Sequence, residues 1–177
     1  MSATRTAVER ALLENRGAVA AYGTTVRALP AEQWATPVRE GAWSPAEITQ
    51  HLLLTYRQVL AELEGGAAMA PRASRGWQRI FRWVVLPHIL FHRSIPVRAR
   101  APRELRPAEP VAVERDALLD ELEVAAREFE RGVEPVALRG SPSFEHPYFG
   151  AIPPLKALRF VAAHTEHHRR QLARLVR

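Results

Sequence analysis

The sequence predicts an all-α protein, a four-helix bundle with an extra helical segment and long crossover loops. Apolar side chains recur every three or four residues in four long segments, which is the period of an amphipathic helix. Stretches rich in proline and glycine separate these segments, and none shows the alternation of a strand. The length of 177 residues suits a single domain over 1–177, and the absence of cysteine excludes disulfides and thiolate ligands.

The first helix is expected over residues 4–29, where Pro30 helps to end it. Its apolar stripe consists of Val8, Leu12, Val19, Tyr22, Val26 and Leu29. The second helix has a clear start, because Ser44 is a good N-cap and Glu47 follows three residues later, as a capping box requires. His51 lies beside the apolar stripe of this helix, so we expect its ring to point inward.

The middle of the chain predicts a third helical segment at 76–85, and Pro87 should kink or break it before residues 88–92. Four prolines between 94 and 110 predict an extended crossover.

A fourth helix is expected over 111–131, with Gly132 as a left-handed cap. After a breaker-rich loop at 141–150, the last helix should begin at the Pro153-Pro154 pair and run to the C-terminus. Its broad apolar face contains Leu155, Leu158, Val161, His164, His168, Leu172 and Leu175.

Positive charge is concentrated in one segment, residues 71–107, which holds nine arginines against one acid, Glu104. A solvated basic face is the ordinary interpretation, and attraction of an anionic substrate or an acidic membrane surface are sharper ones. We expect no nucleic-acid partner, since no reader motif is present. The longest apolar run, 83–91, is too short to span a bilayer, and no signal peptide is evident, so we expect a cytoplasmic protein without stable membrane insertion.

Three histidines predict a metal site. His164 and His168 are four residues apart and so share a helical face, and His51 comes from a separate helix. Three imidazoles can hold one divalent ion and leave a position open for water or substrate. An alternative in which His146 or His167 replaces one ligand stays open, as does a core role satisfied by hydrogen bonds.

Another histidine pair with the same spacing, His88 and His92, is interpreted as an aromatic helix end, because prolines bound it on both sides. Paired carboxylates of the di-iron type are missing from the core stripes, so we expect one ion and not two.

Several polar residues are candidates for a supporting role around the ligands. The outer-shell candidates are Glu47, Gln50, Glu166 and Gln171. Candidates for a general base are Glu145, His146 and Glu166, and we name Glu166 as the catalytic residue.

The motif Trp43-Ser-Pro-Ala-Glu-Ile-Thr-Gln-His51 resembles the second helix of the DinB-like superfamily. The loop from His146 to Gly150 and the helix from His164 to Gln171 are similar to its closing segments. The resemblance implies a metal-binding four-helix bundle, a homodimer, with ligands matching His51, His164 and His168. We expect one divalent transition metal, zinc or nickel first.

Relatives of this kind include transferases and isomerases that use low-molecular-weight thiols. The resemblance therefore implies a small-molecule substrate, such as a low-molecular-weight thiol, and a metal-dependent transferase or hydrolase that activates a thiol or water. The alternative is a non-catalytic metal-binding or interaction module whose arginine-rich segment docks an anionic partner.

Overall fold

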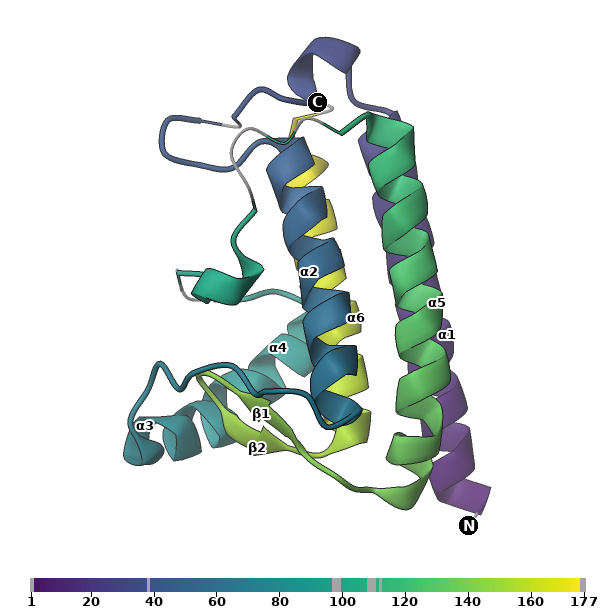
Figure 1. Cartoon of the computed structure of the whole chain (residues 1–177), viewed down its shortest axis with the longest axis vertical. Helices are drawn as coiled ribbons and strands as arrows, with labels where there is room; N and C mark the ends of the chain where they lie inside the picture. Colours follow the sequence, from purple (N-terminus) through teal and green to yellow (C-terminus); the bar gives the residue numbers. More distant parts are fainter. Residues whose placement is uncertain (1, 38, 97–99, 108–110, 112, 176–177) are drawn as a thin grey trace.

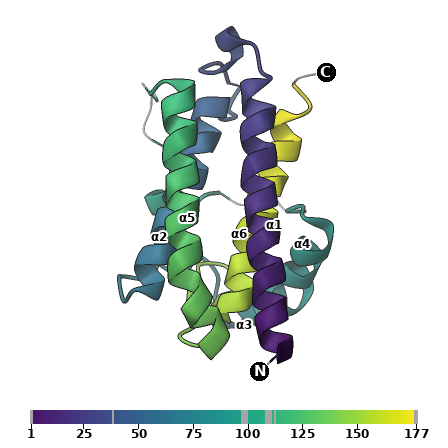
Figure 2. The ribbon, with the colours of Figure 1, turned by 90° about the vertical axis from the view of Figure 1, so that its right-hand side faces the viewer.

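Four long helices form the bundle. The computed structural model describes residues 2–37, 39–96, 100–107, 111 and 113–175, and in it these helices are α1 (Ser2–Arg27), α2 (Pro45–Leu63), α5 (Arg115–Arg139) and α6 (Pro154–Leu172) (Figure 1). α1 packs mainly on α6, and α2 packs mainly on α5. Figure 2 shows these two pairs side by side. The predicted all-α bundle is confirmed.

The order of the helices explains the long crossover. α2 and α5 run in the same direction, and so do α1 and α6 (Figures 1 and 2). Parallel neighbours cannot be joined by a tight turn, so the chain must travel the full length of the bundle between α2 and α5. The short 3₁₀ helix η3 (Arg103–Leu105) lies in this crossover, and residues 97–99, 108–110 and 112 of the predicted segment are outside the described residues.

The first part of the crossover is a helical arm, which we define as residues 75–92. It consists of α3 (Arg75–Ile80), a π-helical turn η2 (Phe81–Val85) and α4 (Leu86–His92) in direct succession. Of the two outcomes expected at Pro87, a kink or a break, the break does not occur, because the helical segments follow one another without interruption. The π-helical turn precedes this proline and includes the carbonyl four residues before it, which a proline ring meets in a regular α-helix.

α2 begins as the sequence predicts. The backbone N–H of Ser44 donates to Glu47 Oε2 at 2.6 Å, and the backbone N–H of Glu47 donates to Ser44 Oγ at 3.3 Å. This capping box is confirmed, and it occupies the Glu47 carboxylate, one of the outer-shell candidates.

Two expectations for the second half of the chain were wrong. α5 continues to Arg139, where Gly140 (φ 78°) forms the left-handed cap. Gly132 is inside the helix, and a Cβ there would collide with the side chain of Leu60 on α2, so this glycine allows close packing of two helices. α6 ends at Leu172, before the C-terminus.

A hairpin that the sequence did not predict joins α5 to α6. Its strands are β1 (Phe144–His146) and β2 (Gly150–Ile152), paired antiparallel with Phe144 opposite Ile152. Three-residue strands are too short to show a period-two pattern, which is why the sequence gives no strand signal here. The hairpin closes one end of the bundle beside the arm (Figure 1).

Buried polar groups in the middle of the bundle are hydrogen-bonded to one another. Tyr56 donates its hydroxyl to Asn15 Oδ1 at 2.7 Å, and the Asn15 amide donates to Glu130 at 3.0 Å. Arg16 completes the chain of contacts with a 2.7 Å ion pair to the same carboxylate. Among the described residues, no helix is both long enough and apolar enough to cross a membrane.

Candidate metal centre

The bundle brings the three predicted histidines together. His51 comes from α2, and His164 and His168 come from adjacent turns of α6. His164 Nε2 lies 3.3 Å from His51 Nε2 and 3.0 Å from His168 Nε2. All three side chains are buried, with exposed fractions of 4%, 8% and 9% in chain order. We call this group the three-histidine cluster.

Hydrogen bonds at the outer ring nitrogens fix which atom of His51 and His168 faces the cluster. The Nδ1–H of His51 donates to the backbone carbonyl of Leu105 at 2.7 Å, because a carbonyl can only accept. The Nδ1–H of His168 donates to Gln171 Oε1 at 3.1 Å. In their neutral forms both rings therefore present an Nε2 lone pair to the same point.

His164 cannot satisfy both of these lone pairs. If its Nε2 carries a proton, the proton can be donated to one neighbour only, and the other lone pair stays unmatched. Its Nδ1 is buried and has no hydrogen-bond partner among the described residues. Buried polar groups normally have a bonding partner. The unmatched lone pairs of this cluster therefore call for a group that binds electron pairs, such as a metal ion.

A metal ion fits this requirement. Ligand nitrogens about 2.0 to 2.1 Å from a tetrahedral zinc ion lie about 3.3 Å apart, close to the 3.0 and 3.3 Å found here. Within the described part of the chain, these three histidines are the group of ligand residues close enough together to hold an ion. Their all-nitrogen donor set suits a divalent transition metal.

The surroundings keep the imidazoles in the neutral form that binds metal. Burial is the main cause that lowers the pKa of His51, and the hydrogen bond to Leu105 opposes it in part. Burial likewise lowers the pKa of His164 and of His168 well below the ordinary value, and the neighbouring histidines of the cluster add to this effect. Metal binding at neutral pH would therefore require no loss of ring protons.

Aromatic rings form part of the wall around the cluster. Trp43 contacts the His51 ring with centroids 5.0 Å apart, and Phe160 stacks on His164 at 5.9 Å and 17° between planes. Apolar walls reduce water access and so strengthen electrostatic interactions at the centre.

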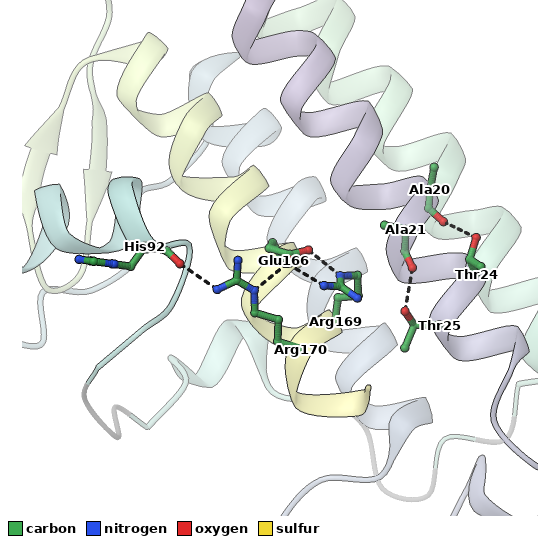
Figure 3. Close-up of polar contacts among 8 residues, drawn as sticks. All are labelled: Ala20, Ala21, Thr24, Thr25, His92, Glu166, Arg169 and Arg170. Atoms are coloured by element: carbon green, nitrogen blue, oxygen red, sulfur yellow. Dashed lines mark hydrogen bonds and ion pairs between the residues drawn. The ribbon is translucent and has the colours of Figure 1, made fainter. Parts of the chain in front are cut away.

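Glu166, the predicted catalytic residue, lies elsewhere on α6. It follows His164 by two residues, which turns it about 200° around the helix axis, toward the opposite face. Its carboxylate accepts hydrogen bonds from Arg169 at 2.6 and 2.9 Å and from Arg170 at 2.7 Å (Figure 3). The bond to Arg169 is the first cause that lowers the pKa of Glu166. Its catalytic role stays a prediction.

The alternative ligands do not join the cluster. His146 accepts the backbone N–H of Tyr148 at its Nδ1 and stacks on Phe149, and His167 accepts the backbone N–H of Ile95. The His88–His92 pair is exposed on the arm, with ring centroids 4.4 Å apart. Glu145, another candidate base, is exposed on β1.

One functional contact was missed by the sequence-based reasoning. The carbonyl that orients His51 belongs to Leu105, 54 residues away in the crossover. Every residue has a carbonyl, so no residue type could identify this one in advance. Of the outer-shell candidates, Gln171 contacts the ring of a proposed ligand, whereas the carboxylates of Glu47 and Glu166 bind Ser44 and two arginines.

A comparison with protein families gives a match over most of the chain. The family model described as the DinB superfamily matches residues 14–172, a span that includes all three histidines and most of the four bundle helices. Comparisons with curated proteins and with solved structures gave no match.

Proposed function

We propose a function for this chain, which belongs to the DinB superfamily. It is a metal-dependent enzyme in which His51, His164 and His168 hold one divalent transition metal ion. The observation that carries the proposal is the convergence of three buried Nε2 atoms, whose lone pairs the His164 ring cannot all match, together with a His164 Nδ1 that has no hydrogen-bond partner among the described residues. Zinc and nickel are the first candidates, because neutral imidazoles suit both.

The proposed reaction class is thiol-dependent transfer or hydrolysis on a small molecule. When bound, such an ion supplies Lewis acidity that favours the deprotonated form of a thiol or of water near neutral pH. The protein would contribute orientation: the Leu105 carbonyl holds the His51 ring, and the Gln171 amide holds the His168 ring. Trp43 and Phe160 would limit the access of bulk water.

Two arginines favour an anionic substrate or co-substrate. Arg103 and Arg106 are exposed and flank Leu105, whose carbonyl touches the cluster. Guanidinium groups bind carboxylates in a bidentate manner, so a low-molecular-weight thiol that carries carboxylates would suit this approach. This argument favours transfer over hydrolysis. The proposal also includes a cytoplasmic homodimer acting as a single domain over 1–177.

Glu166 enters the proposal only as the candidate for acid–base catalysis that the sequence indicated. In the observed position its carboxylate is shared by two arginines, so it would have to exchange both contacts to reach a substrate. A general base works best when its pKa is near the working pH, whereas these contacts lower the pKa of Glu166.

Elemental analysis of untagged protein tests the metal site. We expect about one equivalent of a divalent ion per chain, and loss of this ion in His51→Ala, His164→Ala and His168→Ala. His88→Ala is the matched control, because it removes an exposed histidine from another helix. Full metal occupancy in all three single variants would refute the proposed ligand set.

A screen with electrophiles and common cellular thiols tests the reaction class. We expect turnover that needs both the metal and a thiol, or the metal and water alone. In such an assay Glu166→Gln should abolish turnover if this residue is the base, and should leave it nearly unchanged if it only binds arginines. Metal-loaded protein without turnover would favour the second candidate, a non-catalytic interaction module, which the exposed apolar side chains of the arm support.

A further inference from the structure

The helical arm has two apolar faces, and only one of them is covered. Leu86 and Ile89 point into the core, each 1% exposed. On the outer side, Trp83 is 72% exposed and Phe91 is 82% exposed. Large apolar side chains that are this exposed on a helix have no partner within the described part of the bundle.

The exposed apolar residues are concentrated on the arm. Of the seven large hydrophobic side chains that are exposed in the described residues, five lie there: Trp77, Ile80, Trp83, Val84 and Phe91. The α-helical spacing of 100° per residue places Trp77 and Ile80 on one side of α3, and Trp83 and Val84 follow in the π-helical turn. The arm extends sideways from the bundle beside the hairpin (Figure 1). The exposure of these five side chains means that the four long helices do not cover them.

Exposed basic residues lie at one end of the arm. Arg72, Arg75 and Arg79 are all exposed at the start of the arm. The segment 71–107 carries nine arginines and one acid, a net charge of +8 within a chain whose total is +6. The rest of the chain is therefore slightly acidic, and the positive charge is local to the crossover.

This charge decides between two occupants of the apolar face. A second copy of the arm laid on the first would bring two arginine-rich segments together, and the single acid of each could not balance them. An anionic membrane surface offers opposite charge and an apolar layer directly below it. Tryptophan and phenylalanine with arginine on the flanks are typical of helices that lie in this interface.

We propose that the arm binds an anionic membrane surface, lying in its plane with Trp83, Val84 and Phe91 in the boundary between headgroups and acyl chains. No described helix can cross a bilayer, so the attachment is peripheral. The proposal does not depend on the metal centre, which lies between α2 and α6.

Co-sedimentation with vesicles tests this proposal. The full chain is mixed with vesicles of phosphatidylcholine alone or of a three-to-one mixture with phosphatidylglycerol. We expect binding to the anionic vesicles, a fall in binding as salt rises, and little binding to the neutral ones. Tryptophan emission should shift to shorter wavelength on binding, because Trp77 and Trp83 are exposed in the free protein.

Two paired variants separate the apolar and the electrostatic contributions. Trp83→Ser with Phe91→Ser, and Arg75→Gln with Arg79→Gln, should each weaken binding at least about tenfold. The matched controls are Leu13→Ser on α1, which is 66% exposed, and Arg131→Gln with Arg139→Gln on α5, and these should bind as the natural chain does. Circular dichroism and metal content, unchanged in all variants, would show that the fold is intact.

Three results would overturn the proposal. These are no binding to anionic vesicles at low salt, equal binding to neutral vesicles, or full binding by both arm variants. Sedimentation analysis adds a fourth: if Trp83→Ser with Phe91→Ser converts a dimer to a monomer, a second copy covers this face instead of lipid.

Discussion

The three-histidine cluster and the helical arm depart from the usual distribution of side chains in opposite ways. The cluster places three polar rings in the apolar interior, and one ring nitrogen there has no partner. The arm places large apolar side chains in water, up to 82% exposed at Phe91. The unpartnered ring nitrogen lowers the stability of the free chain, because it gives up hydrogen bonds to water on folding. The exposed side chains of the arm stay in water and leave an apolar surface available for a partner.

The comparison shows how a binding site can be recognised without its ligand. A buried polar group without a partner predicts a polar or ionic ligand, and an exposed apolar group predicts an apolar one. The same bundle holds a control, since Asn15, Tyr56 and Glu130 are buried and satisfy one another. Burial of polar groups alone therefore does not indicate a site, whereas the unmatched lone pairs of the cluster do.

Metal binding should have the largest effect on the cluster. Free zinc at about a thousand times its dissociation constant should raise the unfolding free energy by about 4 kcal/mol. His164→Leu should abolish this increase, yet in the presence of chelator it should be at least as stable as the natural chain. The reason is that leucine removes the unpartnered Nδ1 and keeps an apolar volume in place.

Chemical denaturation with and without chelator measures both quantities. His88→Ala is the control, because its exposed ring contributes little to either. A metal-free His164→Leu protein that is several kcal/mol less stable would mean that this histidine is a well-satisfied core residue.

Substitutions on the two faces of the arm should differ almost as much in their effect on the unfolding free energy. Ile89→Ala, at 1% exposure, should lower the unfolding free energy by about 2 to 4 kcal/mol, because it leaves a cavity in the core. Trp83→Ser, at 72% exposure on the same arm, should change it by less than about 0.5 kcal/mol. Urea titrations of both variants at low protein concentration measure this difference. Equal losses would show that the outer face is already packed in the free protein.

Much of this architecture could be predicted from the sequence, because helical periodicity and capping are local. The stripe around His51 predicted its burial, and the spacing of His164 and His168 predicted that they share a face. The interpretation of Gly132 as a helix end failed because its role depends on Leu60, on a helix far away in the chain. Local rules describe which conformations a residue allows, and tertiary contacts decide which one it adopts.

Prediction of the site from the sequence had similar limits. The residue types of the proposed ligands were informative, since histidine is costly to bury on a bundle stripe. The position of Glu166 was not, because two arginines on the same helix compete for its carboxylate. The Leu105 carbonyl depended entirely on the path of the crossover.

The support around the cluster should have a smaller effect than the ligands. Gln171→Leu removes the acceptor of the His168 Nδ1–H and should weaken metal binding about 10- to 100-fold, with stoichiometry unchanged. Gln171→Glu keeps an acceptor and should restore most of the affinity. Gln58→Leu is the control, because its amide binds the Ala67 carbonyl on the surface. Competition titrations with a metal chromophore measure the affinities, and an unchanged value for Gln171→Leu would exclude this residue from the site.

The pH dependence of the stability tests how strongly the His146 ring is desolvated. Desolvation lowers the pKa of His146 to about 3, from an ordinary value of 6.5. The unfolded chain therefore binds a proton as the pH falls below 6.5 while the folded chain does not, so stability decreases from there toward pH 3. His146→Asn keeps an acceptor for the Tyr148 N–H but cannot be protonated in this range.

Thermal melts of the two proteins with chelator present, at a series of pH values, measure this contribution together with the smaller effect that the charge of His146 has on the pKa of His164. Between pH 7 and pH 5 we expect the melting temperature of His146→Asn to fall by about 4 to 8 °C less than that of the natural chain, which corresponds to roughly 2 kcal/mol. Parallel pH profiles would mean that the His146 ring stays accessible to water in the folded chain. The hairpin would then belong, like the arm, to the part of the molecule that water reaches. The water-excluded interior would include Phe160 but not His146.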